Sequence, residues 1–481
     1  MLTMLGSPRR CCDGITRRET LKAGALTALG GFGLPQILFA NESGIARHGP
    51  AKNVMVLYLL GGAATQDMWD LKPQAPAEVR SLFQPIDTSA SGVRVCEHLP
   101  QMARWMDRAA VVRTVNHKAG CHNTLPSYSG FEQSLPDITT TKDTYPPSMG
   151  SVCEFLRLKD RGDQGGLPDY VYMPCYLGWG QNIRRPGPYG GFLGKHCDAL
   201  TTECEPFKPE GSPNALPGTP LTVLGSPRLP QTKLQDGVTL NRLTSRRTLL
   251  TQFDDEQRRL DRSRMVDTFG RNHRQAYEML TSPKMRGAFD LEQEDSRLVE
   301  RYGKTLFGNS ALIGRRLLER GVRFVNVTWD LFWDRVPIDY DAWDTHQRNF
   351  EILQKNKLPG LDQVFSALME DLQSRGLLDE TLIVIMSEMG RTPRINANAG
   401  RDHWTSCYSV LFAGAGIRGG TLYGESDDQA AYVKDLPVST SDICATIYRC
   451  LGIDPEMRVP DHSGRPVEIS HGGKPIAEIL V

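Results

Sequence analysis

The chain has no excess of charge of either sign. Its 56 Lys and Arg residues are balanced by 56 Asp and Glu residues, so no net field would hold the protein on nucleic acid or on an acidic membrane. Residues 241–305 are rich in arginine, but acidic residues are interleaved with the basic ones, which favours a solvated helical face over a nucleic-acid patch. We therefore expect no nucleic-acid partner, and any anionic ligand must be bound by a few local groups.

Long apolar runs are also missing. After the first 40 residues no segment approaches the roughly 18 uninterrupted apolar residues that a membrane-spanning helix needs. The sequence therefore predicts no stable membrane span in the mature protein.

The 11 cysteines lack the CxxC spacing of a zinc ribbon. Cys444 and Cys450 fall in an apolar helical pattern and are predicted to be small core residues. Five more lie in a middle region rich in Gly and Pro, where disulfides are plausible: Cys121, Cys153, Cys175, Cys197 and Cys204.

The first 40 residues have the pattern of an export signal. Arg17 and Arg18 precede a short, Gly-rich apolar stretch at 23–34, and Ala40 offers a small residue at a cleavage point. The segment resembles a twin-arginine signal peptide, and the alternative is a chance arginine pair before a buried helix. We predict a signal peptide at 1–40, a single domain at 41–481, and a periplasmic or otherwise extracytoplasmic location.

Six short apolar runs rich in β-branched residues predict strands. Their apolarity is continuous rather than alternating, which is typical of strands buried on both faces of a parallel sheet. The runs are 54–60, 110–115, 170–173, 322–328, 382–386 and 409–413.

Helical patterns lie between these runs. One covers 361–372 and stops near Gly376, and another begins at Ser441 or Asp442 and ends at Gly452. The alternation predicts an α/β fold, a three-layer α/β/α sandwich with a mostly parallel sheet. Residues of about 116–240 predict a loop-rich insertion over one edge of that sheet.

Polar residues follow the predicted strands where ligands bind in open α/β sheets, beyond the carboxyl ends. Asp344 and His346 come after the run at 322–328, and their spacing of two places them on one side of an extended backbone. The alternative for this pair is a surface Asp beside a helix-capping Thr345.

Two further clusters belong to the same edge. Glu388 and Arg391 come after the run at 382–386, and Asp402 and His403 lead into the next strand. Carboxylates and imidazoles from separate loops suit a divalent metal, and Arg391 could hold an oxyanion.

His117 and His122 follow the predicted strand at 110–115 and are expected to face the same site. His122 is a candidate either for a metal ligand or for the proton donor to a leaving group. A loop histidine bonded only to backbone is the plain alternative.

At this point three motifs carry a resemblance: WDTH at 343–346, EMGRTP at 388–393 and GRDHW at 400–404. Together they resemble a family of uncharacterised twin-arginine-exported proteins in the alkaline-phosphatase-like superfamily, which includes sulfatases and phosphoglycerate mutases. The resemblance extends over essentially the whole chain after the signal. It implies an alkaline-phosphatase-like sandwich and hydrolysis of phosphate or sulfate esters at a metal site.

The sequence departs from that superfamily at the first strand. Where phosphatases and sulfatases place a metal-binding Asp, this chain has Gly61-Gly62, so Asp67 or Asp70 is a candidate substitute. The sulfatase nucleophile motif is absent, which argues against a formylglycine sulfatase. Thr65 is one candidate nucleophile, and a metal-bound water is the other.

Two functions follow from these residues. The first is a hydrolase of a small-molecule or glycan ester that uses Zn²⁺, Mn²⁺ or Ca²⁺, with Arg391, Thr65 and His122 in catalytic roles. Its predicted metal ligands are Asp344, His346, Glu388, Asp402, His403 and Asp67. The alternative is a catalytically degenerate envelope protein that keeps the sandwich and binds a glycan or a protein through its long loops.

Overall fold

A computed structural model describes residues 49–161, 167–206, 223–230, 282–332 and 343–481. The predicted signal peptide at 1–40 and most of the arginine-rich segment lie outside these residues. The described residues belong to one compact unit, residues 48–481. None of the helices in these ranges is both long and apolar enough to cross a membrane.

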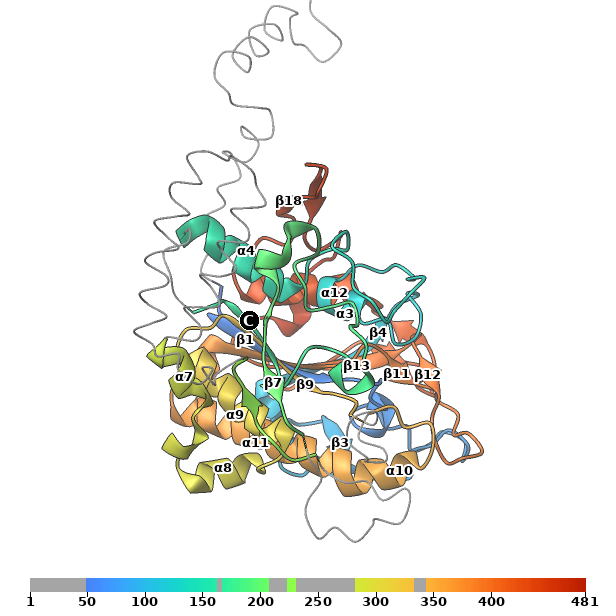
Figure 1. Cartoon of the computed structure of the whole chain (residues 1–481). Coiled ribbons are helices and arrows are strands. Elements are labelled where there is room, and N and C mark those ends of the chain that lie inside the picture. The colour runs from blue at the N-terminus through green and yellow to red at the C-terminus, as the bar shows by residue number, and fades with distance from the viewer. Residues whose placement is uncertain (1–48, 162–166, 207–222, 231–281, 333–342) are drawn as a thin grey trace, which may run out of the picture. The chain divides into compact units, whose positions relative to one another are not determined.

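A nine-stranded sheet forms the centre of the unit (Figure 1). Its strands follow the order β14-β4-β13-β10-β1-β9-β5-β6, and β17 pairs with β4 beside β14. All six predicted strands are confirmed. The strands are β1 (Asn53–Leu59), β4 (Ala109–Asn116), β5 (Tyr170–Met173), β6 (Leu200–Thr201), β9 (Phe324–Trp329), β10 (Thr381–Met386), β13 (Tyr408–Gly414), β14 (Thr421–Tyr423) and β17 (Val438–Ser439).

The sheet is mostly parallel, as predicted, with one reversed strand. β1 runs parallel to β10 and β9, and β5 runs parallel to β9. β13 is antiparallel to both of its neighbours, β10 and β4. The amino end of β13 therefore lies at the same edge as the carboxyl ends of β1, β4, β9 and β10.

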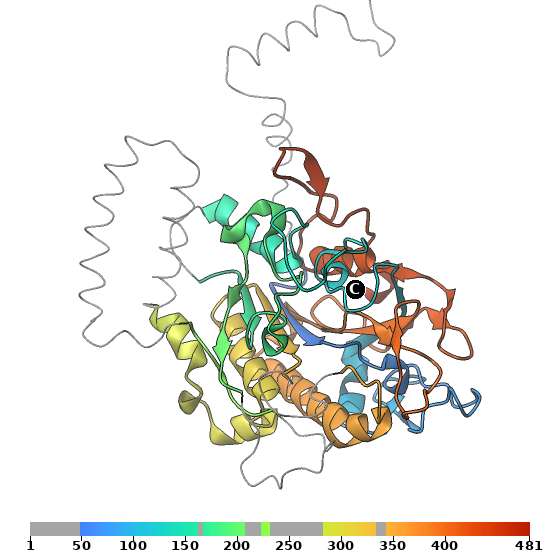
Figure 2. The same ribbon diagram turned by 45° about the vertical axis from the view of Figure 1, so that its right-hand side comes forward.

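Helices cover both faces of the sheet (Figures 1 and 2). Alternate residues of β1 explain why, because Met55 and Leu57 belong to one buried apolar cluster while Val54 and Val56 belong to the other. On the first face lie α7 (Pro283–Phe289), α8 (Ser296–Tyr302), α9 (Leu306–Glu319), α10 (Asn349–Ile352) and α11 (Leu358–Ser374). On the second lie α3 (Leu125–Ser129), α4 (Met149–Arg161) and α12 (Thr440–Cys450). The three-layer α/β/α sandwich is thereby confirmed.

The remaining elements are short. Small strands pair two by two: β2 (Pro85–Asp87) with β3 (Arg94–Cys96), β7 (Glu203–Cys204) with β8 (Pro227–Arg228), β11 (Gly390–Arg391) with β12 (His403–Trp404), β15 (Glu425–Ser426) with β16 (Val433–Asp435), and β18 (Arg458–Pro460) with β19 (Pro466–Glu468). Single 3₁₀ turns are η1 (Thr65–Asp67), η3 (Trp179–Gln181), η4 (Gly191–Leu193), η5 (Lys195–Cys197), η6 (Leu291–Gln293), η8 (Leu378–Glu380) and η9 (Ala477–Ile479). The longer η2 (Met102–Arg108) is also 3₁₀, and η7 (Leu353–Lys357) is a π-helix.

The predicted cap of α12 is wrong by two or three residues. The helix is capped by Ser439, whose hydroxyl oxygen accepts from the Asp442 N–H at 3.2 Å. The Asp442 carboxylate accepts in return from the Ser439 N–H at 2.8 Å. This reciprocal capping box satisfies two N–H groups at once, which a cap at Ser441 or Asp442 would not do.

The prediction of disulfides in the middle region is wrong for this structure. All nine cysteines from Cys96 to Cys450 lie in described residues, none of them forms a disulfide bond, and among them only Cys121 is exposed. Cys444 and Cys450 are fully buried, as predicted. The middle region also contributes β5 and β6 to the sheet. Four of its five cysteines, Cys153, Cys175, Cys197 and Cys204, pack in buried apolar clusters as small core residues.

Candidate metal centre

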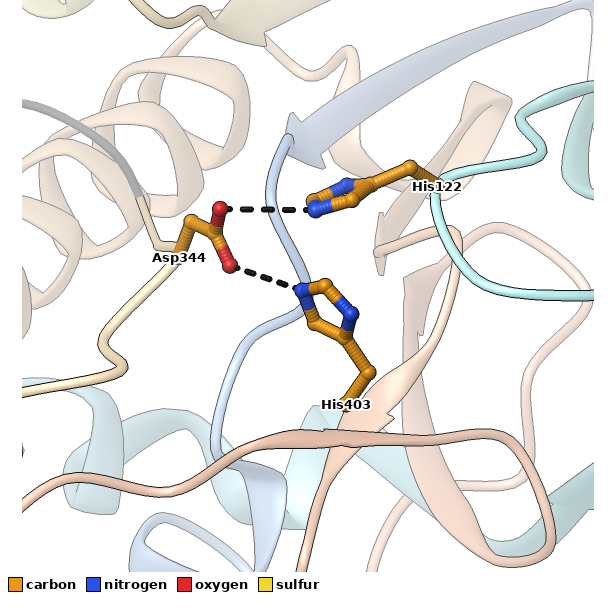
Figure 3. Close-up of side chains that lie close together, drawn as sticks. All are labelled: His122, Asp344 and His403. Carbon is orange, nitrogen blue, oxygen red and sulfur yellow. Dashed lines mark hydrogen bonds and ion pairs between the residues drawn. The ribbon is translucent and has the colours of Figure 1, made fainter.

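Three residues from distant parts of the sequence meet at the edge of the sheet where β13 begins (Figure 3). Asp344 follows β9, His122 follows β4, and His403 lies in β12, just before β13. One ligand atom from each of them lies within 4.8 Å of the other two. The His122 Nε2 is 3.3 Å from one Asp344 oxygen, and the His403 Nε2 is 3.1 Å from the other.

His346 adds a second imidazole on the same Asp344 oxygen. Its Nε2 lies 3.1 Å from Asp344 Oδ1 and 2.8 Å from the His403 Nε2. Its Nδ1 is 2.7 Å from Asp402 Oδ1, and a carboxylate there fixes the proton on Nδ1 and leaves a lone pair on Nε2. We call Asp344, His122, His346 and His403 the imidazole–carboxylate cluster.

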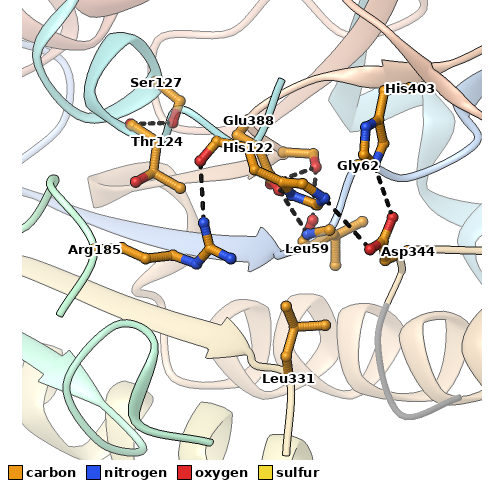
Figure 4. Close-up of polar contacts among 12 residues, drawn as sticks. Leu59, Gly62, His122, Thr124, Ser127, Arg185, Leu331, Asp344, Glu388 and His403 are labelled. Carbon is orange, nitrogen blue, oxygen red and sulfur yellow. Dashed lines mark hydrogen bonds and ion pairs between the residues drawn. The ribbon is translucent and has the colours of Figure 1, made fainter. Parts of the chain in front are cut away.

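Glu388 lies behind this cluster rather than among its ligand atoms (Figure 4). The His122 ring bridges the two acids, with Nδ1 at 3.2 Å from Glu388 Oε1 and Nε2 directed at Asp344. Glu388 Oε1 also accepts from the Gly61 N–H at 2.8 Å, and the acid is fully buried. The predicted ligand Glu388 is thus placed to orient His122.

Asp402 is likewise an orienting group in this geometry. Its side chain is 55% exposed, and its Oδ1 is occupied by His346 Nδ1 and by the Asn396 amide. The structure therefore places Asp402 one step outside the cluster for which it was predicted as a ligand.

The electrostatics keep the carboxylates of the site ionised. Burial alone raises the pKa of Asp344, but hydrogen bonds from His122 and His403 and the charge of Arg391 bring it far below its usual value. Burial lowers the pKa of His122, yet its bonds to Asp344 and Glu388 raise it above the usual value. The pKa of His403 is lowered, chiefly by burial.

Arg391 does not present a free guanidinium to the site. Its Nε donates to the Gly62 carbonyl at 2.7 Å and its Nη1 to the Arg401 carbonyl at 3.1 Å. Its Nη2 bonds the Gly61 carbonyl and the Asp344 carboxylate. The predicted oxyanion-binding residue is therefore occupied in fixing Asp344 against the loop after β1.

The Gly61-Gly62 pair has a steric explanation. Gly61 has φ +113°, and a Cβ there would lie 2.7 Å from the backbone nitrogen of Asp344. The loop after β1 therefore allows Asp344 to approach closely, and an Asp at this position would block that approach.

The predicted substitutes after β1 lie outside the cluster. Both oxygens of Asp67 are bound by Arg401, at 2.8 and 2.9 Å, and both side chains are fully buried. Asp70 pairs with Lys72 at 3.1 Å. Because their charges are already neutralised, we leave Asp67 and Asp70 out of the proposed site.

Thr65, a predicted candidate nucleophile, lies buried with its hydroxyl group already hydrogen-bonded. It is 3% exposed, and its hydroxyl oxygen accepts from the Ser409 N–H at 3.0 Å. His117 is also structural, since its Nδ1 accepts from the Ala119 N–H and its Nε2–H donates to the Glu388 carbonyl at 2.8 Å. Burial lowers the pKa of His117, in keeping with a neutral ring.

Two residues near the site were not singled out from the sequence. Asp330 directly follows β9, and burial raises its pKa to about 7. The rule that pointed to Glu388 after β10 could have found it. Arg185, whose Nη1 donates to the His122 carbonyl at 3.2 Å, lies in a stretch rich in Gly and Pro with no periodicity to mark it.

His122 itself has an unusual backbone. Its φ is +53°, a conformation that costs a non-glycine residue roughly 1–2 kcal/mol. The surrounding contacts hold this conformation, and strained residues of this kind are concentrated at functional sites.

The protein is a mixed α/β sandwich that carries an imidazole–carboxylate cluster at one edge of its sheet. The chain belongs to the family described as "Protein of unknown function (DUF1501)", whose model matches residues 51–480. No curated protein matches the chain.

Solved structures that are similar to this chain include the following three proteins. The PsFucS1 sulfatase from Pseudoalteromonas sp. is 12% identical, with a TM-score of 0.39, over 95% of this chain and 77% of that one. A protein in the alkaline phosphatase superfamily from Vibrio parahaemolyticus is 11% identical, with a TM-score of 0.34, over 91% and 72%. The phosphonate monoester hydrolase SpPMH from Silicibacter pomeroyi is 10% identical, with a TM-score of 0.36, over 89% and 76%. Likenesses this distant do not identify a reaction.

Proposed function

We propose that this protein is a metal-dependent hydrolase of phosphate or sulfate esters that acts outside the cytoplasm. The observation that carries the proposal is the convergence of Asp344, His122 and His403, whose ligand atoms lie within 4.8 Å of one another. These residues come from three segments that are far apart in the sequence, and they meet where ligands bind in open α/β sheets.

The ligand set fits a divalent cation. Imidazole nitrogens and one carboxylate oxygen suit Zn²⁺ or Mn²⁺, whereas Ca²⁺ takes oxygen ligands. The two Nε2 atoms of His346 and His403, only 2.8 Å apart, need a proton or a cation between them. When bound, such a cation polarises an ester oxygen and lowers the pKa of water.

The exposure of the side chains indicates the direction of substrate approach. His346 is 42% exposed and His403 24%, while Asp344 is 11% exposed. The His346 side of the cluster is therefore the side that is open to solvent, from which a substrate would enter. Asp402 holds the proton of His346 on Nδ1, so that Nε2 is available to bind the cation or to accept a proton from water.

Water is the nucleophile that this proposal requires. The hydroxyl of Thr65 is buried and already accepts a backbone hydrogen bond, so it is not placed to attack a substrate. The substrate class is a small-molecule or glycan ester, and Arg17 and Arg18 in the N-terminal segment support export through the twin-arginine route.

The second candidate is a binding protein that has kept the sandwich and lost the chemistry. The neutralised charges of Arg391 and Asp67 favour it, because neither is available to a substrate. In that case the imidazole–carboxylate cluster would bind a cation without turnover, or would bind none.

Replacing one ligand decides between the two. Elemental analysis of purified protein should find stoichiometric Zn or Mn, and an aryl phosphate and aryl sulfate screen should find turnover. His403→Ala should lose both, because His403 supplies one of the three convergent ligand atoms. His462→Ala, at an exposed histidine, should keep both.

The contrary results are equally clear. Turnover retained in His403→Ala would defeat the assignment of the site. A wild-type protein that is free of metal and inert toward both esters would support the binding protein.

A further inference from the structure

Arg185 is the exception among the buried arginines of the described residues. Five arginines are buried there, namely Arg185, Arg315, Arg316, Arg391 and Arg401. Four of them pair with carboxylates: Arg315 with Asp371, Arg316 with Glu294, Arg391 with Asp344 and Arg401 with Asp67. Arg185 has no carboxylate within 4.0 Å among the residues that the structure describes.

The hydrogen bonds of Arg185 go only to neutral acceptors. Its Nε and Nη2 donate to the Gln181 amide oxygen at 3.1 and 2.8 Å, and its Nη1 donates to the His122 carbonyl. A guanidinium carries five N–H groups, so one N–H on each terminal nitrogen has no partner in the part of the chain that the structure describes. The residue is only 5% exposed.

A buried charge of this kind needs an opposite charge. Removing a guanidinium from water is costly unless an anion compensates it, and the other four buried arginines follow that rule. The acids that act on Arg185, Asp330 and Glu388, do so from beyond ion-pair distance. An anion that is not part of the described residues would complete its environment.

The position of Arg185 indicates which anion. Its guanidinium lies against the backbone of His122, whose ring points into the imidazole–carboxylate cluster (Figure 4). Arg185 belongs to the segment between β5 and β6, on the opposite side of His122 from Asp344. Arg391, which the sequence favoured for this role, has its charge taken by Asp344.

We propose that Arg185 binds the anionic group of the substrate, so that the site selects tetrahedral oxyanion esters, phosphate or sulfate, over uncharged esters. This inference rests on the proposed function and deepens it by assigning the residue that recognises charge. Two unused N–H groups on a planar guanidinium match two oxygens of such a group, and charge-assisted hydrogen bonds of this type are the strong ones.

The test measures anion binding separately from metal binding and turnover. Inorganic phosphate and inorganic sulfate are titrated calorimetrically into the metal-loaded full chain and into Arg185→Gln and Arg185→Lys. Arg185→Gln should weaken binding of the preferred anion by about 10- to 100-fold. Arg185→Lys should weaken it by less, because lysine keeps the positive charge but lacks the paired N–H donors of the planar guanidinium. The two titrations also show which of the two anions is preferred.

The neighbouring arginine is a matched control. Arg184 is exposed, and its guanidinium stacks on the rings of Tyr176 and Tyr189 at 5.4 and 5.3 Å. Arg184→Gln should leave anion affinity unchanged. All variants should keep the wild-type metal content.

Three results would overturn the assignment: equal anion affinity in Arg185→Gln and wild type, no binding of either anion by wild type, or loss of metal in Arg185→Gln. The last would show that Arg185 acts only by positioning His122. Failure of the proposed function appears elsewhere, as absent metal or absent turnover in the wild-type protein. The two failures are therefore distinguishable.

Discussion

Asp67 and Asp344 are two acids predicted for the same site, and the structure gives them opposite surroundings. Asp67 is fully buried, and Arg401 binds both of its oxygens while Asn349 donates to one of them. Asp344 shares its oxygens between one guanidinium and three imidazoles, and part of the group reaches solvent. Every contact of the Asp67 carboxylate is supplied by N–H donors of the chain, and we call this the complete environment. The contacts around Asp344 lack enough protons to satisfy all the ring nitrogens, and we call this the incomplete environment.

The difference lies in what the partners can supply. A guanidinium always carries its protons, so the contact with Asp67 is satisfied at any ordinary pH. A neutral imidazole has one proton, and His346 already uses its proton on Asp402. The Nε2 atom of His346 therefore presents a lone pair to the His403 Nε2 atom 2.8 Å away, and a proton or a cation between the two rings satisfies that contact.

The largest effect on stability should come from removing the carboxylate of Asp67 from its pair with Arg401. Asp67→Ala leaves Arg401 charged and unpaired in the interior, and should lower the free energy of unfolding by about 3–5 kcal/mol in denaturant titrations. Asp87→Ala removes an acid from an exposed pair with Arg94 and should cost less than about 1 kcal/mol. An equal loss of free energy of unfolding in Asp67→Ala and Asp87→Ala would show that the buried pair of Asp67 with Arg401 stabilises the fold no more than an exposed pair does.

A smaller effect, on the affinity for metal, should come from removing Asp402, which orients the His346 ring. Asp402→Ala frees the His346 ring to reorient, and should weaken metal binding by about 10- to 100-fold in a competition assay with a chelating dye. Asp379→Ala, which removes an exposed acid paired with Arg108, should have no effect. Unchanged affinity in Asp402→Ala would place His346 outside the metal centre.

The smallest effect concerns a histidine outside both environments. Burial lowers the pKa of His471 to about 4, whereas an unfolded histidine has a pKa of about 6.5. Between pH 7.5 and 5.5 the unfolded chain therefore gains a proton that the folded chain does not, and the free energy of unfolding falls by about 1 kcal/mol.

His471→Asn should remove that loss, and Asn tolerates the φ of +52° at this position. Denaturant titrations at the two pH values measure the difference. An equal change in the free energy of unfolding between the two pH values in wild type and variant would show that His471 is not the source of the pH dependence. The variant also separates the pH dependence of folding from that of the site.

The sequence predicted six of the nine strands of the sheet and missed the short strands β6, β14 and β17. The central strands were predictable because they are buried on both faces. β1 and β10 are almost wholly apolar, and every residue of β1, β9 and β10 is buried. Position alone also brought Asp344, His346 and His403 to one edge. This part of the site needed only the rule about strand ends.

The roles of individual side chains were harder to predict because they depend on distant partners. Asp67 is neutralised by a residue 334 positions away, and Thr65 is bonded to one 344 positions away. No local pattern reports such pairings. Arg185 is the converse case, because no carboxylate lies within 4.0 Å of it among the described residues, and no local pattern reports that absence either.

The reversed strand β13 has a consequence for how the site is assembled. In a parallel strand the residues that reach this edge follow the strand, as Asp344 follows β9. β13 instead starts at this edge, and only residues 404–407 separate it from His403 in β12. His403 is therefore held at the edge by a short segment next to β13, whereas His122 and Arg185 lie in long connections between strands. Sequence changes in those connections therefore leave the short link between His403 and β13 intact.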